Sequence, residues 1–60
     1  MVTLKRHHGP IAHTSEHDSI DAALIALIWD HQDGSTTVYE ILEDGEVVMD
    51  HATIMKAIGL

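Results

Sequence analysis

The hydrophobic pattern of the chain centres on one apolar run, from Ala22 to Trp29, in which no side chain is polar. Two adjacent stripes in this region have the i, i+3, i+4, i+7 spacing of an α-helix. We therefore predict a helix over residues 18–32 whose apolar surface is too wide for one small sheet to cover. The stripe expected to face the core comprises Ile20, Ala23, Leu24, Leu27 and Ile28, and the second comprises Ala22, Ile25, Ala26 and Trp29.

Polar residues mark both ends of this helix. Asp18 is a suitable N-cap, and Asp21 stands three residues later, where a carboxylate favours the helix dipole. Thr14 or Ser15 would instead cap an earlier start. Gly34, within the stretch HQDGS, is expected to end the helix.

The stretch TTVYEILEDGEVVMD predicts a β-hairpin, because two β-rich runs flank Asp44-Gly45, a dipeptide typical of tight two-residue turns. A two-residue loop pairs Leu42 with Val47. One face of the hairpin then carries Val38, Leu42, Val47 and Met49, with Glu40 among them, and is expected to face the core. The other face carries Tyr39, Ile41 and Val48 and is expected to point outward.

The two ends of the chain complete an α+β domain over residues 1–60. Residues 1–8 alternate as a strand would, and Gly9-Pro10 signals a turn before a short second strand. Residues 1–14 thus form either an edge hairpin or a loose arm. Asp50 can cap a short C-terminal helix that ends at Gly59. The predicted order is (β)-α-β-β-α, with the central hairpin packed on the apolar helix. The inward side chains expected of the C-terminal helix are Ile54, Met55 and Ile58.

The second helical stripe raises the question of what covers it. Ile25 and Trp29 would expose about 300 Å² of apolar area, worth up to about 7 kcal/mol when buried. The chain ends of the same molecule, a second copy in a symmetric homodimer, or a different protein could each cover the stripe. We expect a homodimer, with Ala22, Ile25, Ala26 and Trp29 as the apolar binding surface.

The charge is strongly negative and unevenly placed. The net charge is −7, and residues 16–50 hold all ten acidic groups and no Lys or Arg. Such a segment disfavours direct binding of nucleic acid and favours a basic protein partner, or simply keeps the surface solvated. Carboxylates on a rigid hairpin could also imitate phosphates and occupy a basic nucleic-acid-binding surface. The candidate acidic residues are Glu40, Glu43, Asp44, Glu46 and Asp50.

The sequence contains few patterns typical of catalytic or metal-binding sites. The chain has six histidines and no cysteine, so disulfides and thiolate metal sites are excluded. His13 and His17 would share a helix face only if the helix began early, and a third ligand is lacking. The serines stand at cap or turn positions, and there is no Gly-rich phosphate loop. We expect neither an enzyme nor a bound metal or cofactor.

The segment from Ser19 to Ile58, with its alanine-rich helix followed by TVYEILEDGEVVMD, resembles small phage and actinobacterial accessory proteins. The resemblance implies an accessory role, such as inhibition of a host defence system or a place in a virion. We therefore hypothesise a non-enzymatic protein–protein interaction module, a small acidic phage-type inhibitor or modulator that binds a host protein. A structural subunit of a larger assembly is the alternative, and a histidine metal-binding protein is the third.

The sequence also predicts a location. Lys5 and Arg6 are followed by His7, His8 and Gly9 rather than by the apolar run of a signal peptide. The apolar run from Ala22 to Trp29 is far shorter than the roughly 20 residues of a membrane-spanning helix. We expect a cytoplasmic protein, in the host cytoplasm if a phage encodes it.

Overall fold

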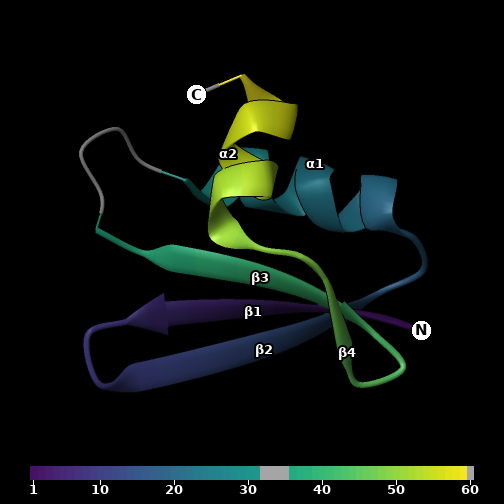
Figure 1. Cartoon of the computed structure of the whole chain (residues 1–60), viewed down its shortest axis with the longest axis horizontal. Coiled ribbons are helices and arrows are strands. Elements are labelled where there is room, and N and C mark those ends of the chain that lie inside the picture. Colours follow the sequence, from purple (N-terminus) through teal and green to yellow (C-terminus); the bar gives the residue numbers. More distant parts are fainter. Residues whose placement is uncertain (32–35, 60) are drawn as a thin grey trace.

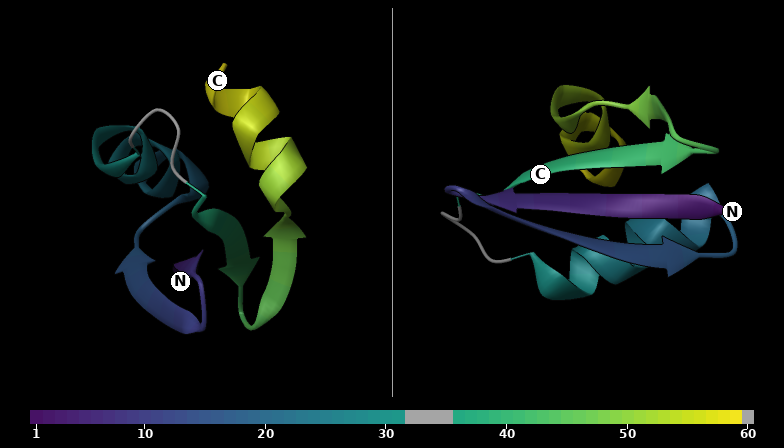
Figure 2. Two further views of the ribbon diagram at one scale, coloured as in Figure 1. Left: turned by 90° about the vertical axis from the view of Figure 1, so that its left-hand side faces the viewer. Right: turned by 90° about the horizontal axis from the view of Figure 1, so that it is seen from below.

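The chain folds as a β-β-α-β-β-α unit in a computed structural model that describes residues 1–31 and 36–59 (Figure 1). The four strands form one antiparallel sheet in the order β2-β1-β3-β4, and both helices lie on one face of it (Figures 1 and 2). The predicted α+β class is therefore confirmed. The elements are β1 (Val2–His8), β2 (Ile11–His17), α1 (Ile20–Asp30), β3 (Val38–Glu43), β4 (Glu46–Met49) and α2 (His51–Ile58).

The N-terminal segment forms a β-hairpin, and its first strand lies inside the sheet. Gly9, which has a positive φ of 61°, and Pro10 make the turn, and His8 pairs with Ile11 across it. β1 pairs with β2 on one side and with β3 on the other. Residues 1–14 are therefore not a loose arm, because β1 is a central strand and not an edge.

Helix α1 begins at a different cap from the one predicted. The hydroxyl of Ser19, not the carboxylate of Asp18, accepts a hydrogen bond from the backbone N–H of Ala22, at 3.1 Å. β2 stays extended as far as His17, so the chain has no room for a cap earlier than the Asp18-Ser19 bend. α1 ends at Asp30, and the predicted stop at Gly34 lies outside the described residues.

The second hairpin, β3–β4, has the predicted turn and an unpredicted bulge. Asp44 and Gly45 have φ values of 52° and 85°, the two positive angles that a type I′ turn requires. Leu42 pairs with Val47 as expected, but Ile41 pairs with Met49 instead of Val48. The extra residue in β4 brings Met49 onto the side of Ile41, where it packs against the core.

The core lies between the sheet and the two helices, and it corrects the predicted face of the hairpin. Tyr39 and Ile41 are buried, whereas Val38 and Val47 are exposed. The reason is the pairing with β1, in which Ile41 lies opposite Leu4, because directly paired residues point to the same face of a sheet. The buried residues are Val2, Leu4, Ala23, Leu27, Tyr39, Ile41 and Ile54.

Helix α2 forms as its sequence predicts. Asp50 accepts a hydrogen bond from the backbone N–H of Thr53 at 2.9 Å. Gly59 ends the helix in the left-handed conformation, with a φ of 76°. Ile54 is buried, and Met55 and Ile58 pack partly against the core, so the predicted inward face is confirmed.

The cap of α2 makes stability depend on acid pH. The hydrogen bond from Thr53 lowers the pKa of Asp50 from its usual value of 3.8. A carboxylate with a lowered folded-state pKa stabilises the fold above its unfolded pKa, and this stabilisation is lost as the pH falls through the folded pKa. We expect Asp50→Asn to lower the melting temperature at about pH 5, and the difference from the natural protein to shrink by about pH 2.

Thermal unfolding followed by circular dichroism at both pH values measures this effect. Asp18→Asn, at the predicted but unused cap, controls for the loss of one negative charge. A difference between the Asp50 variant and the natural protein that stays constant across this pH range would contradict the prediction.

Candidate functional site

The outer face of α1 is the largest concentration of exposed apolar side chains on a single element. Trp29 is 84% exposed, Ile25 56% and Ile28 51%, whereas Ala22 and Ala26 are half-buried. We call these five residues the α1 stripe. Leu27 and Ala23, on the opposite side of the helix, are completely buried. The four residues predicted as an apolar binding surface thus share one face of the helix.

No segment of the described residues covers the exposed side chains of the α1 stripe within one molecule. Helix α2 packs on β3 and contacts α1, but Trp29 and Ile25 stay exposed beside it. Ile28 was expected in the core stripe, and this expectation is wrong because its side chain is half exposed. Intramolecular cover by the chain ends is therefore excluded within the described residues.

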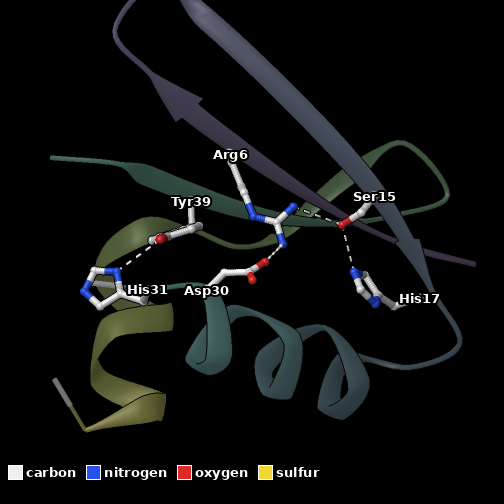
Figure 3. A network of polar contacts seen from close by, with 6 residues as sticks. All are labelled: Arg6, Ser15, His17, Asp30, His31 and Tyr39. Carbon is white, nitrogen blue, oxygen red and sulfur yellow. Dashed lines mark hydrogen bonds and ion pairs between the residues drawn. The ribbon is translucent and has the colours of Figure 1, made fainter. Parts of the chain in front are cut away.

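A polar cluster lies beneath the C-terminal end of α1 (Figure 3). Arg6 reaches from β1 and donates hydrogen bonds to the Asp30 carboxylate at 2.8 Å and to Ser15 Oγ at 3.2 Å. Ser15 Oγ in turn lies 2.8 Å from Nε2 of His17. The guanidinium joins the last residue of α1 to both strands of the N-terminal hairpin. Arg6 thus fixes the helix end that carries Trp29.

The Ser15–His17 hydrogen bond resembles the nucleophile and base of a catalytic site. A serine nucleophile needs a neighbouring base, and the base needs a third group to orient it. Of the described residues, none with a carboxylate is hydrogen-bonded to His17, and Ser15 Oγ already accepts from Arg6. No pocket opens over this pair in the described part of the chain. Ser15 and His17 both lie on β2, and Arg6 connects this pair to Asp30 of α1.

A second cluster surrounds Tyr39, whose ring is flanked by two histidines. His51 stacks on the ring with centroids 5.9 Å apart, and His31 meets it edge-on at 5.6 Å. The Tyr39 hydroxyl lies 3.0 Å from Nδ1 of His31, and the Tyr39 backbone N–H donates to Nδ1 of His51 at 3.0 Å. Burial raises the pKa of the Tyr39 hydroxyl above its usual value of 10.0.

The histidines predicted as weak metal candidates do not come together. His13 and His17 lie on strand β2, not on a helix, so four residues separate their Cα atoms by about 13 Å. Within residues 1–31 and 36–59, no three His, Asp or Glu side chains are placed to hold a metal ion. A spacing of four residues brings two side chains together only on a helix, and His13 and His17 lie on an extended strand.

The five predicted acidic residues make different contacts in the structure. Glu40 Oε1 lies 2.9 Å from Nε2 of His7 on the sheet, and Asp50 is the cap of α2. Only Glu43, Asp44 and Glu46 lie together, at the exposed tip of the β3–β4 hairpin. Asp44 also lies 3.7 Å from the N-terminal amine. We therefore define the acidic site as the three carboxylates of this tip and leave out Glu40 and Asp50.

These features define a small α+β domain with an unpartnered apolar helix face and a separate acidic tip. No protein-family model, curated protein or solved structure matches the chain. Across the described ranges, neither helix has the length and hydrophobicity to cross a membrane.

Proposed function

We propose that the chain is a non-enzymatic protein-interaction module that binds another protein through the α1 stripe. The observation that supports this proposal is the exposure of Trp29, with Ile25 beside it one helical turn earlier. Tryptophan is among the residues most enriched at binding hot spots, where a buried aromatic ring supplies much of the affinity. A side chain of this size left in water has no role in the core of its own domain.

The energetics favour an occupied surface. Burying Ile25 and Trp29 would contribute up to about 7 kcal/mol, which is comparable to the whole stability of a typical small domain. The same area left in water promotes aggregation. A partner that covers the α1 stripe therefore gains binding energy and keeps the protein dispersed.

The structural support for the α1 stripe suits a preformed binding surface. Ser19 caps the helix at one end, and the Arg6–Asp30 ion pair holds the other end at 2.8 Å. Leu27 anchors the middle of the helix in the core. A rigid helix loses little conformational entropy when it binds, which improves the affinity obtained from a given area.

A second contact is supported by the charge. Glu43, Asp44 and Glu46 are exposed at the hairpin tip, and the whole chain carries −7. An inhibitor of the phage type that occupies a basic nucleic-acid-binding surface would use this tip, and its binding would weaken steeply with added salt. A structural subunit of a larger assembly would use the α1 stripe, and its binding would respond little to salt.

The test is a comparison of Trp29→Ser with the natural protein as bait in a pull-down from a lysate of the cells that express it. We expect Trp29→Ser to keep the circular dichroism spectrum, because an 84% exposed side chain contributes little to the core. We expect the Trp29→Ser bait to capture at least tenfold less of the partner protein than the natural bait does.

Val47→Ser is the control, because Val47 is an exposed apolar residue that lies on the β3–β4 hairpin and not on α1. It should capture as much as the natural chain. Equal capture by Trp29→Ser and the natural chain would overturn the proposal. Capture that falls with salt and with Glu43→Lys, and not with Trp29→Ser, would assign binding to the acidic tip instead.

A further inference from the structure

Among the described residues, no strand pairs with the outer edge of β2, and this free edge lacks the usual protection against pairing. It is seven residues long and stands at one end of the strand order. Natural edge strands are commonly short, bulged or charged, which prevents another strand from adding to them. β4, at the opposite edge, is four residues long, has the bulge and begins at Glu46. β2 has one charged residue, Glu16, and is therefore the edge open to a further strand.

The α1 stripe lies beside this same edge. Seen from below the sheet, α1 runs back along β2 in the opposite direction, and its C-terminal end extends beyond the free edge (Figure 2). Trp29 is one residue from this end of the helix. A strand added to β2 would therefore bring the helix that packs on that strand's own sheet close to Trp29.

The rotation of the helix agrees with this placement. Asp30 points at the sheet, because its carboxylate binds Arg6 of β1. At about 100° per residue, the buried Leu27 lies about 60° from Asp30 on the core side. Ala22 and Trp29 lie at about 80° and about 100° on the other side of Asp30. These two residues therefore face sideways, past the free edge of β2.

We propose that a second copy of the chain occupies this edge, with β2 paired antiparallel to β2 and α1 packed against α1. The inference rests on the proposed function and names the partner of the α1 stripe. A twofold axis through Thr14, the middle residue of β2, is the one that pairs all seven residues. The resulting pairs are Thr14 with Thr14, His13 with Ser15, Ala12 with Glu16 and Ile11 with His17.

The same axis sets the two α1 helices side by side and antiparallel on one face of an eight-stranded sheet. The Arg6 guanidinium binds both Ser15 and Asp30, so the last turn of α1 lies close to the middle of β2. The same axis therefore brings the Trp29 side chains of the two copies toward each other.

Charge also favours this edge for two molecules that each carry −7. Glu43, Asp44 and Glu46 lie at the turn of the β3–β4 hairpin, away from β2 in the strand order. Glu16 accepts a hydrogen bond from Thr3 at 3.2 Å and lies opposite Ala12 in the dimer, not opposite its own counterpart. The β2 strand itself thus brings one carboxylate per copy to the pairing, compared with three at the hairpin tip.

The area is sufficient for a stable pair. Burying the exposed parts of Trp29 and Ile11 would remove roughly 300 Å² of apolar surface from each copy. A standard interface removes about 800 Å² from each partner, and the paired β2 strands supply the remainder. The acidic hairpin tips stay exposed at the two ends of the joined sheet.

Cysteine substitution tests the pairing, since the natural chain has no cysteine. Cα atoms of directly paired antiparallel residues lie about 4.5 or about 5.5 Å apart, within the range of disulfides. We expect Thr14→Cys to form a disulfide-linked dimer under mild oxidation at least tenfold faster than Thr53→Cys, an exposed threonine in α2. Ala12→Cys and Glu16→Cys should each link slowly alone, and the double variant should link rapidly.

Light scattering behind a sizing column, over a hundredfold concentration range, completes the test. The natural protein should approach twice its monomer mass of 6.6 kDa, and Trp29→Ser should remain a monomer with an unchanged circular dichroism spectrum. A natural protein that stays monomeric, or a dimer in which Thr14→Cys links no faster than Thr53→Cys, would overturn the inference.

The two proposals fail separately. A monomer that still captures a protein through Trp29 in the pull-down overturns the homodimer and leaves the interaction module standing. A monomer that captures nothing through Trp29 overturns both.

Discussion

Leu27→Ala is expected to leave the protein largely unfolded at room temperature. Leu27 is completely buried between α1 and the sheet, and removing a buried leucine side chain costs about 2–5 kcal/mol. A single core in a chain this short supplies only about 3–5 kcal/mol of stability. The loss is therefore comparable to the whole free energy of unfolding.

Ile28→Ala is the control for this prediction, because Ile28 is the next residue on the same helix and is half exposed. It should cost less than about 1 kcal/mol, since most of its surface already contacts water. Urea unfolding followed by circular dichroism at low protein concentration measures both variants as monomers. Equal losses for Leu27→Ala and Ile28→Ala would show that α1 is rotated differently on the sheet.

Tyr39→Ala is expected to destabilise the protein by about 3–5 kcal/mol, the cost of truncating a buried aromatic side chain. Tyr39 is 2% exposed and is held between His31 and His51. Removing the ring takes away a central part of the core on β3. It also leaves both imidazoles without their aromatic neighbour.

Tyr39→Phe separates the ring from the hydroxyl. This variant keeps the ring contacts and removes the hydrogen bond to His31, so it should cost about 1 kcal/mol. Urea unfolding of the two variants measures the difference. A loss for Tyr39→Phe as large as that for Tyr39→Ala would show that the hydroxyl, not the ring, carries the stabilisation.

The natural protein and Tyr39→Phe should also differ in how their stability depends on pH. Burial raises the pKa of Tyr39 above 10.0, so the folded state holds the phenol proton more tightly than the unfolded state does. The stabilisation is present below about pH 10 and is lost as the pH rises through the folded pKa. Stability should therefore fall more steeply above about pH 10 in the natural protein than in Tyr39→Phe.

Local signals in the sequence predicted the turn of the second hairpin and both ends of α2 correctly. Asp44-Gly45 makes the tight turn of the second hairpin, and Asp50 and Gly59 bound α2. Each depends on a backbone angle or a hydrogen bond within a few residues, so neighbours in sequence contain the necessary information. The cap of α1 was missed by one residue, because Asp18 and Ser19 are both suitable caps and the end of β2 selects Ser19.

The candidate site was predicted in part. Ile25 and Trp29 are exposed together as expected of a binding surface, and Ile28 joins them against expectation. The five hairpin carboxylates were expected together, but pairing with His7 and capping of α2 draw Glu40 and Asp50 into separate contacts. The free edge of β2 had no signal in the sequence, because nothing in a strand's own residues tells whether a neighbour lies on each side of it.

The sequence by itself determined α1, the second hairpin and α2 in this order, the turns between paired strands and the excess of apolar surface on α1. It left residues 1–14 open between an edge hairpin and a loose arm. Only the tertiary structure decided which side of β3 faces the core, where β4 bulges and which stripe of α1 stays exposed. Both faces of β3 and both stripes of α1 carry apolar residues, so periodicity alone cannot choose between them. The pairing of Ile41 with Leu4 on a distant strand, and the contact of Leu27 with the core, make the choice.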